Sequence, residues 1–187
     1  MSLVADTSER LTARVVEQSA PAIAPYRMPA KVMHWISAVL VIGMVASGVI
    51  AKQIAEGPVA DTMFSLHKLV GVITLSLIVV RLLYRLFSAL GSGEAPNRRW
   101  ALHWTLYGVV LLVPLLGWAG ISDFGALEIF PGITLPGIWP QGWGYDELLL
   151  EYHAYFAFVL LALVALHIGV AVHDYMTDEY ADVPQPK

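Results

Sequence analysis

Apolar residues gather in four long stretches of the chain, and polar or Pro/Gly-containing segments separate them. The stretches run Val32–Ala51, Phe64–Phe87, Ala101–Ile121 and Leu148–Val172. A helix needs about 20 apolar residues to cross the hydrocarbon core of a bilayer, and each stretch is long enough. The pattern therefore predicts an all-α fold, an integral membrane four-helix bundle.

The longest connection, Ser122–Glu147, does not resemble a solvated linker. It holds many apolar side chains, broken by prolines and glycines: Phe124, Leu127, Ile129, Phe130, Ile133, Leu135, Ile138, Trp139 and Trp143. We expect this segment to lie in the membrane interface or to cap the bundle. The alternative interpretation is a docking site for a redox partner.

Composition narrows the chemistry that such a bundle can carry. The chain has 187 residues, of which 57% are hydrophobic and 14% charged, whereas about a quarter of residues are charged in a soluble domain. The net charge of -4 gives no nucleic-acid signal. The chain has no cysteine, which excludes disulfides, cysteine-held iron–sulfur clusters and covalently attached c-type haem. A redox cofactor would have to be held by histidine or methionine.

Basic residues predict the orientation. They precede the first span and surround the link between the second and third, whereas the other side offers only Lys52 and Lys68; the first group is Arg10, Arg14, Arg27, Lys31, Arg81, Arg85, Arg98 and Arg99. Basic residues accumulate on the cytoplasmic side of membrane proteins. We therefore expect cytoplasmic N- and C-terminal tails, residues 1–30 and 176–187.

Two histidines of the last span mark two depths in the membrane. His153 and His167 are 14 residues apart, which is a rise of about 21 Å along a helix. At roughly 100° per residue, the second imidazole returns to within about 40° of the first. One helix face thus carries an imidazole near each side of the membrane.

The other spans supply a partner at each depth. Because successive spans alternate in direction, His67 lies with His153 on the expected outer side, and His34 and His103 lie with His167 on the inner side. Two imidazoles from facing helices suit the two axial positions of a haem iron in a bundle core. Polar groups inside a bilayer are costly and point to function.

Small or basic residues recur at the matching offset. Fourteen residues after the histidines of the first three spans come Gly48, Arg81 and Gly117, and Gly71 follows His67 by one turn. Glycine would let a flat macrocycle approach the helix. Arginine at the inner level would pair with a haem propionate.

Other interpretations of the histidines stay open. A lone intramembrane histidine can simply bond to a neighbouring helix, and histidines can also relay protons or line a solute path. Zinc usually takes three or four protein ligands at one place. His103 remains over at the inner level once His34 is matched with His167, so it would bond a propionate, help bind a quinone, relay a proton or form a plain interhelical hydrogen bond. His173 is expected on the cytoplasmic surface.

An ordered set of short motifs carries a family resemblance. The set reads His34-Trp35, His67-Lys68-x-x-Gly71, Val80-Arg81-Leu82 with Arg85, Pro114-x-x-Gly117, Glu151-x-His153 and Leu166-His167. Over about Tyr26–Tyr175 the chain resembles the bacterial cytochrome b561 family, within the wider group of di-haem b-type subunits that includes the hydrogenase cytochrome b.

The resemblance implies a function. Residues 31–175 would form a transmembrane domain with two non-covalent haems b, ligated by His34 with His167 and by His67 with His153. Members transfer electrons in the bacterial inner membrane, between a periplasmic partner and a membrane quinone such as ubiquinone or menaquinone. Electron transfer to or from the quinone would be a quinone oxidoreductase activity. A haem-bearing anchor subunit of a dehydrogenase- or hydrogenase-type complex is the alternative.

Charge on the expected outer side suggests the partner. This side carries seven acidic residues and only two basic ones, Lys52 and Lys68. The acidic residues are Glu56, Asp61, Asp123, Glu128, Asp146, Glu147 and Glu151. This balance fits a basic donor protein or a neighbouring subunit.

Overall fold

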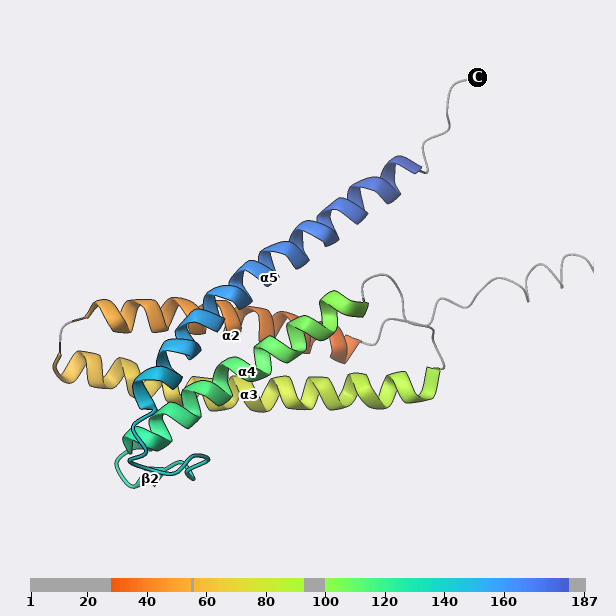
Figure 1. Ribbon diagram of the computed structural model, residues 1–187. Helices are drawn as coiled ribbons and strands as arrows, with labels where there is room; N and C mark the ends of the chain where they lie inside the picture. The colour runs from red at the N-terminus through yellow and green to blue at the C-terminus, as the bar shows by residue number, and fades with distance from the viewer. Residues whose placement is uncertain (1–27, 55, 93–99, 182–187) are drawn as a thin grey trace, which may run out of the picture. The chain divides into compact units, whose positions relative to one another are not determined.

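The computed structural model describes residues 28–54, 56–92 and 100–181 of the chain (Figure 1). Its four long helices are α2 (Met28–Gln53), α3 (Pro58–Ser92), α4 (Trp100–Phe124) and α5 (Asp146–Ala181). All four are long and apolar enough to cross a membrane. The all-α membrane fold and its four spans are confirmed. Residues 1–27 of the expected N-terminal tail and residues 182–187 of the expected C-terminal tail lie outside the described residues.

The helices extend beyond the apolar stretches from which they were predicted. Helix α3 begins at Pro58, a residue favoured in the first turn because its missing N–H would be unpaired there. Helix α5 continues to Ala181, so the first residues of the expected C-terminal tail are helical. Hydropathy marks the membrane-embedded part of a helix, and polar residues can extend the helix into water.

Side-chain contacts show that α2 and α3 run antiparallel. Near one end, the Ser47 hydroxyl contacts the His67 ring, and near the other, Arg81 contacts His34. As the residue number rises along α2, its partner's number falls along α3. Antiparallel neighbours follow from the short connection between these helices.

Helices α4 and α5 also pack antiparallel, and a glycine lets them approach closely. A Cβ atom at Gly120 would lie 2.8 Å from Cγ of Leu150. Further along the same pair, His153 of α5 reaches the backbone of α4 at Val113. The end of α4 is therefore held against the start of α5.

The connection between α4 and α5 is an ordered structure that we call the cap, residues 125–145. It contains a two-stranded antiparallel hairpin, β1 (Glu128–Phe130) and β2 (Ile133–Thr134), beside the end of α4 (Figure 1). The hairpin was not predicted, because strands of three and two residues carry no alternation that a sequence pattern could reveal. Below, "cap end" means the end of the bundle that bears the cap, and "far end" means the opposite one.

Buried polar side chains hold the cap in place. The Asp123 carboxylate is 3% exposed and accepts hydrogen bonds from the backbone N–H groups of Trp143, Gly144 and Tyr145, at 2.7, 3.3 and 2.6 Å. These residues directly precede α5. One carboxylate thus fixes the chain entering α5 against the end of α4.

A lysine joins the cap to α3. The ammonium group of Lys68 donates hydrogen bonds to the backbone carbonyls of Ala126, at 3.1 Å, and Glu128. Lys68 directly follows His67 in the chain. The cap is therefore tied to the turn of α3 that carries this imidazole.

We expect Asp123→Asn to loosen the cap. The amide cannot accept from all three backbone donors, and each lost hydrogen bond to a charged group costs about 1.5–3 kcal/mol. A loss of about 1.4 kcal/mol is one power of ten, so amide hydrogen exchange at Trp143 and Tyr145 should accelerate at least about tenfold. Asp61→Asn, at an exposed residue of α3, is the control; equal exchange rates in both variants would contradict the role of Asp123.

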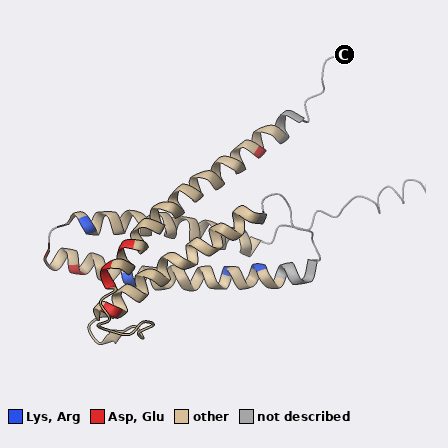
Figure 2. Cartoon of the chain, viewed as in Figure 1, with Lys and Arg blue, Asp and Glu red and all other residues tan. Residues whose placement is uncertain are grey.

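Charge is distributed unevenly along the bundle (Figure 2). Acidic residues gather at the cap end, around the start of α5 and the end of α4, whereas arginines lie on the other half of α3. Between them the helices present apolar side chains outward; Val39, for example, is 69% exposed. An apolar exterior between two polar ends is what contact with lipid requires.

Candidate functional site

Two pairs of imidazoles lie between the helices, one toward each end of the bundle. His67 of α3 faces His153 of α5 at the cap end, with ring centres 6.1 Å apart. His34 of α2 faces His167 of α5 toward the far end, with ring centres 6.2 Å apart. The structure thus brings together, toward each end, imidazoles that were expected at the same depth.

These separations suit a metal ion between the rings. A metal–imidazole nitrogen bond is about 2 Å long, so two rings that ligate one ion from opposite sides have centres roughly 6–6.5 Å apart. Both pairs fall in this range. Within the described part of the chain, no group of three or more His, Cys, Asp or Glu side chains could hold a metal ion.

A backbone carbonyl of α4 holds the His153 ring. The ring nitrogen Nδ1 lies 2.7 Å from the carbonyl oxygen of Val113. A carbonyl only accepts, so Nδ1 carries the proton and donates, and Nε2 keeps its lone pair. Metal-binding histidines are typically held by a hydrogen bond of this kind.

Two of the predicted glycines lie against the imidazoles of the cap-end pair. A Cβ atom at Gly117 would lie 2.9 Å from Nδ1 of His153, and one at Gly48 would lie 3.3 Å from Cε1 of His67. At Gly71 a Cβ would meet only the methyl group of Met44, at 3.4 Å. Gly117 in particular leaves the gap through which His153 reaches α4.

A large cavity contains the cap-end pair. Its volume is about 1360 Å³, above the range of roughly 300–1,000 Å³ typical of small-molecule pockets. Both imidazoles line it, together with Gly48, Gly71 and Gly117. Four carboxylates also line it: Asp61, Glu128, Glu147 and Glu151. Imidazoles and glycines predicted separately from the sequence thus surround one cavity.

The far-end pair has different neighbours. The guanidinium group of Arg81 donates to Nδ1 of His34 at 2.8 Å. The guanidinium groups of Arg81 and Arg85 each lie 5.7 Å from the centre of the Tyr107 ring. Because arginine only donates, Nδ1 of His34 accepts and its Nε2 carries the proton. Two cations therefore lie at this level.

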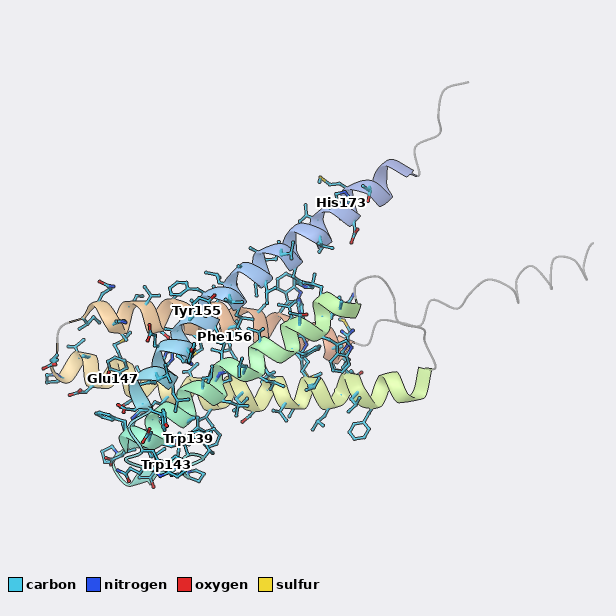
Figure 3. All side chains as sticks on the ribbon, in the orientation of Figure 1. Trp139, Trp143, Glu147, Tyr155, Phe156 and His173 are labelled. Carbon is cyan, nitrogen blue, oxygen red and sulfur yellow. The ribbon has the colours of Figure 1, made fainter. Side chains whose placement is uncertain are left out.

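His103 lies at the level expected of it, close to the far-end pair. Its ring centre is 5.4 Å from that of His167, closer than the ring of His34. The far end thus holds three imidazoles, and the spacing of roughly 6–6.5 Å favours His34 over His103 as the partner of His167. His173 lies far along α5 from the cap (Figure 3). Its side chain is 72% exposed, and Nδ1 lies 3.8 Å from the Asp174 carboxylate.

The groups that support the imidazoles were not predicted from the sequence. Ser47 and the Val113 carbonyl were not singled out, and Lys68 was noted for its charge and as part of the motif that begins at His67, but not as a support of the cap. Ser47 precedes Gly48, whose depth was already matched to His67, so a polar residue there was a usable signal. The Val113 carbonyl gives no signal, because every residue has one.

Membrane-spanning helices that face pairs of imidazoles toward one another define a class, the helical membrane cytochromes. The chain belongs to the prokaryotic cytochrome b561 family, whose sequence model matches residues 25–178. No curated protein is significantly similar to the chain. The family resemblance is confirmed, and with it a multi-pass membrane protein that transfers electrons through b-type haem.

The residues at the cap end fit a haem. The His67 and His153 rings are spaced for one iron, the Nδ1 atom of each ring is engaged by the protein, and glycines widen the cavity beside them. The individual ligand roles stay predictions, and so do the roles of Arg81, His103 and the glycines.

Proposed function

We propose that the protein carries electrons across a bacterial inner membrane through two haems b. His67 and His153 would hold the haem at the cap end, and His34 and His167 the one at the far end. The observation that carries the proposal is the repeated imidazole pair, 6.1 and 6.2 Å between ring centres, with its α5 members about 21 Å apart along the helix.

The protein's part is to hold and orient the cofactors. Bound haem supplies a one-electron iron couple; helix α5 fixes both sites at a set separation because it contributes one imidazole to each. Two imidazoles at each site would leave no open position on a bound iron for O₂, which favours electron transfer over oxygen chemistry.

Arg81 has two acceptors in this proposal. While it donates to Nδ1 of His34, the proton stays on Nε2, which then cannot ligate iron. A haem propionate is a stronger, charged acceptor for a guanidinium group. Transfer of Arg81 from the imidazole to a propionate would leave His34 free to bind through Nε2. His103, beside His167, is placed to bond the other propionate or a quinone.

Charge supports the orientation. The arginines of α3 lie toward the far end and the acidic residues at the cap end (Figure 2), as expected if the far end and both termini are cytoplasmic. The electron donor would then meet the carboxylates around the cap-end cavity from the periplasm, and a basic protein surface would be steered there. Ubiquinone or menaquinone would accept electrons at the far end.

Haem content and redox behaviour test the proposed function. We expect the purified protein to hold about two haems per chain, with sharp b-type bands after dithionite reduction. In reconstituted vesicles, quinol should reduce the haems, and a basic donor should reduce them only from the side where the cap is exposed. A spectrum without b-type bands would instead favour a histidine-lined proton or solute path.

A second candidate function is an anchor subunit of a dehydrogenase- or hydrogenase-type complex. The cap presents an aromatic cluster, Trp139, Trp143 and Tyr145, with Trp143 62% exposed (Figure 3). Exposed aromatic residues are enriched in protein interfaces and also at membrane surfaces. Purification in mild detergent separates the two, because an anchor subunit would carry stoichiometric partners with it.

A further inference from the structure

We propose that Ser47 is a positioning residue for the cap-end haem: it fixes His67 with the proton on Nδ1 and the lone pair on Nε2. The inference rests on the proposed function, since it concerns how one of the iron ligands is prepared. It assigns a task to a hydroxyl group that touches no metal itself.

Only one placement of the hydrogen atoms around Ser47 makes a hydrogen bond of both of its side-chain contacts. Its hydroxyl oxygen lies 2.9 Å from the carbonyl oxygen of Met44 and 2.9 Å from Nδ1 of His67. The hydroxyl has one proton, and the Met44 carbonyl can only accept, so the proton goes there. Only His67 can then supply the hydrogen for the second contact. Both contacts are satisfied only when Nδ1 of His67 donates.

The other imidazole of the pair is held in the same way. His153 donates from Nδ1 to the Val113 carbonyl, so both cap-end rings keep a lone pair on Nε2, the nitrogen left for iron. At the far end, by contrast, Arg81 donates to Nδ1 of His34. The effect of Ser47 on an imidazole is therefore confined to the cap end of the bundle.

This hydrogen bond has an electronic consequence. An imidazole that donates a hydrogen bond from the ring nitrogen that does not bind the metal becomes a more basic ligand. A more basic ligand stabilises ferric iron and so lowers the reduction potential of the haem. At the far end, the positive charge of Arg81 favours the less positive, ferrous state. Both effects place the cap-end haem below the far-end haem in potential. Electrons would then move favourably from the cap end toward the far end.

The test compares Ser47→Ala and Ser47→Thr in two backgrounds that each keep one haem. His167→Ala retains the cap-end haem, and His153→Ala retains the far-end haem. We expect Ser47→Ala to raise the potential and shift the ferric EPR g values of the cap-end haem, and to leave the far-end haem unchanged. Ser47→Thr should restore both values, because its hydroxyl can bond the preceding turn in the same way.

A serine that bonds only its own helix is the matched control. The Ser76 hydroxyl donates to the Val72 carbonyl at 2.8 Å, and the residue is exposed, so Ser76→Ala should change neither haem. An unchanged cap-end potential in Ser47→Ala, an equal shift in both backgrounds, or no restoration by threonine would overturn the inference while the proposed function stands. Wild-type protein without haem would instead overturn the proposed function, and this inference with it.

Discussion

Replacing His153 by alanine removes the cap-end haem and leaves the far-end haem in place. The haem content of the purified protein should fall from about two to about one per chain, because a non-covalently held haem at this site would lose one of its two bonds to the protein. His167→Ala should give the reverse loss. Pyridine haemochrome analysis measures the content, and redox titration shows which haem remains, since the two sites differ in nearby charge.

Two further histidines serve as controls for this experiment. His173→Ala should keep both haems, because the side chain is exposed to solvent and neighbours Asp174 of its own helix. His103→Ala is the more demanding control, since its ring is 5.4 Å from that of His167. If His103→Ala removed a haem and His34→Ala did not, the far-end pairing would be wrong.

The second large effect is expected from adding one methyl group to α4. In Gly117→Ala, the new Cβ would lie 2.9 Å from Nδ1 and 3.0 Å from Cε1 of His153, too close for any real contact. We expect the ring to move away from the new methyl group and to weaken its hydrogen bond to the Val113 carbonyl. We expect cap-end haem occupancy to fall by about half or more, whereas the far-end haem stays bound. Haem content and redox titration again provide the measurement.

The same substitution elsewhere in α4 separates crowding from helix stability. Alanine stabilises a helix by about 1 kcal/mol relative to glycine, so Gly117→Ala should not weaken α4 itself. A Cβ at Gly108 meets nothing within 4 Å, and Gly108→Ala should keep both haems. Equal haem loss in the two variants would show that the gap beside His153 is not the cause.

The main features of this bundle were predictable because membrane helices obey few rules. A span must be long and apolar, and neighbouring spans joined by short links run antiparallel. Residue numbers therefore convert into depths, and the 14-residue offset from His153 to His167 predicts which residues share a level. His67, Gly48 and Gly117 lie at one level with His153 in the structure for this reason.

Other features depend on contacts that no periodicity encodes. Lys68 holds the hairpin of the cap by hydrogen bonds to two backbone carbonyls, those of Ala126 and Glu128. Because every residue has a backbone carbonyl, such partners cannot be inferred from residue types. Depth alone also cannot rank His34 against His103, because both lie at the level of His167. Rotation about the helix axis decides between them, and helix packing sets that rotation.

The hydrogen bond from His153 to Val113 has a consequence for how this sequence can vary. Helix α4 contributes no side chain to the cap-end pair, and its support comes from a backbone oxygen. Any amino acid at position 113 presents the same oxygen, so the side chain there is free to change as far as this bond is concerned. Position 117 has no such freedom, because only glycine leaves the gap. A designer who copied only the ligand-bearing helices would therefore omit the segment that holds one of the ligands.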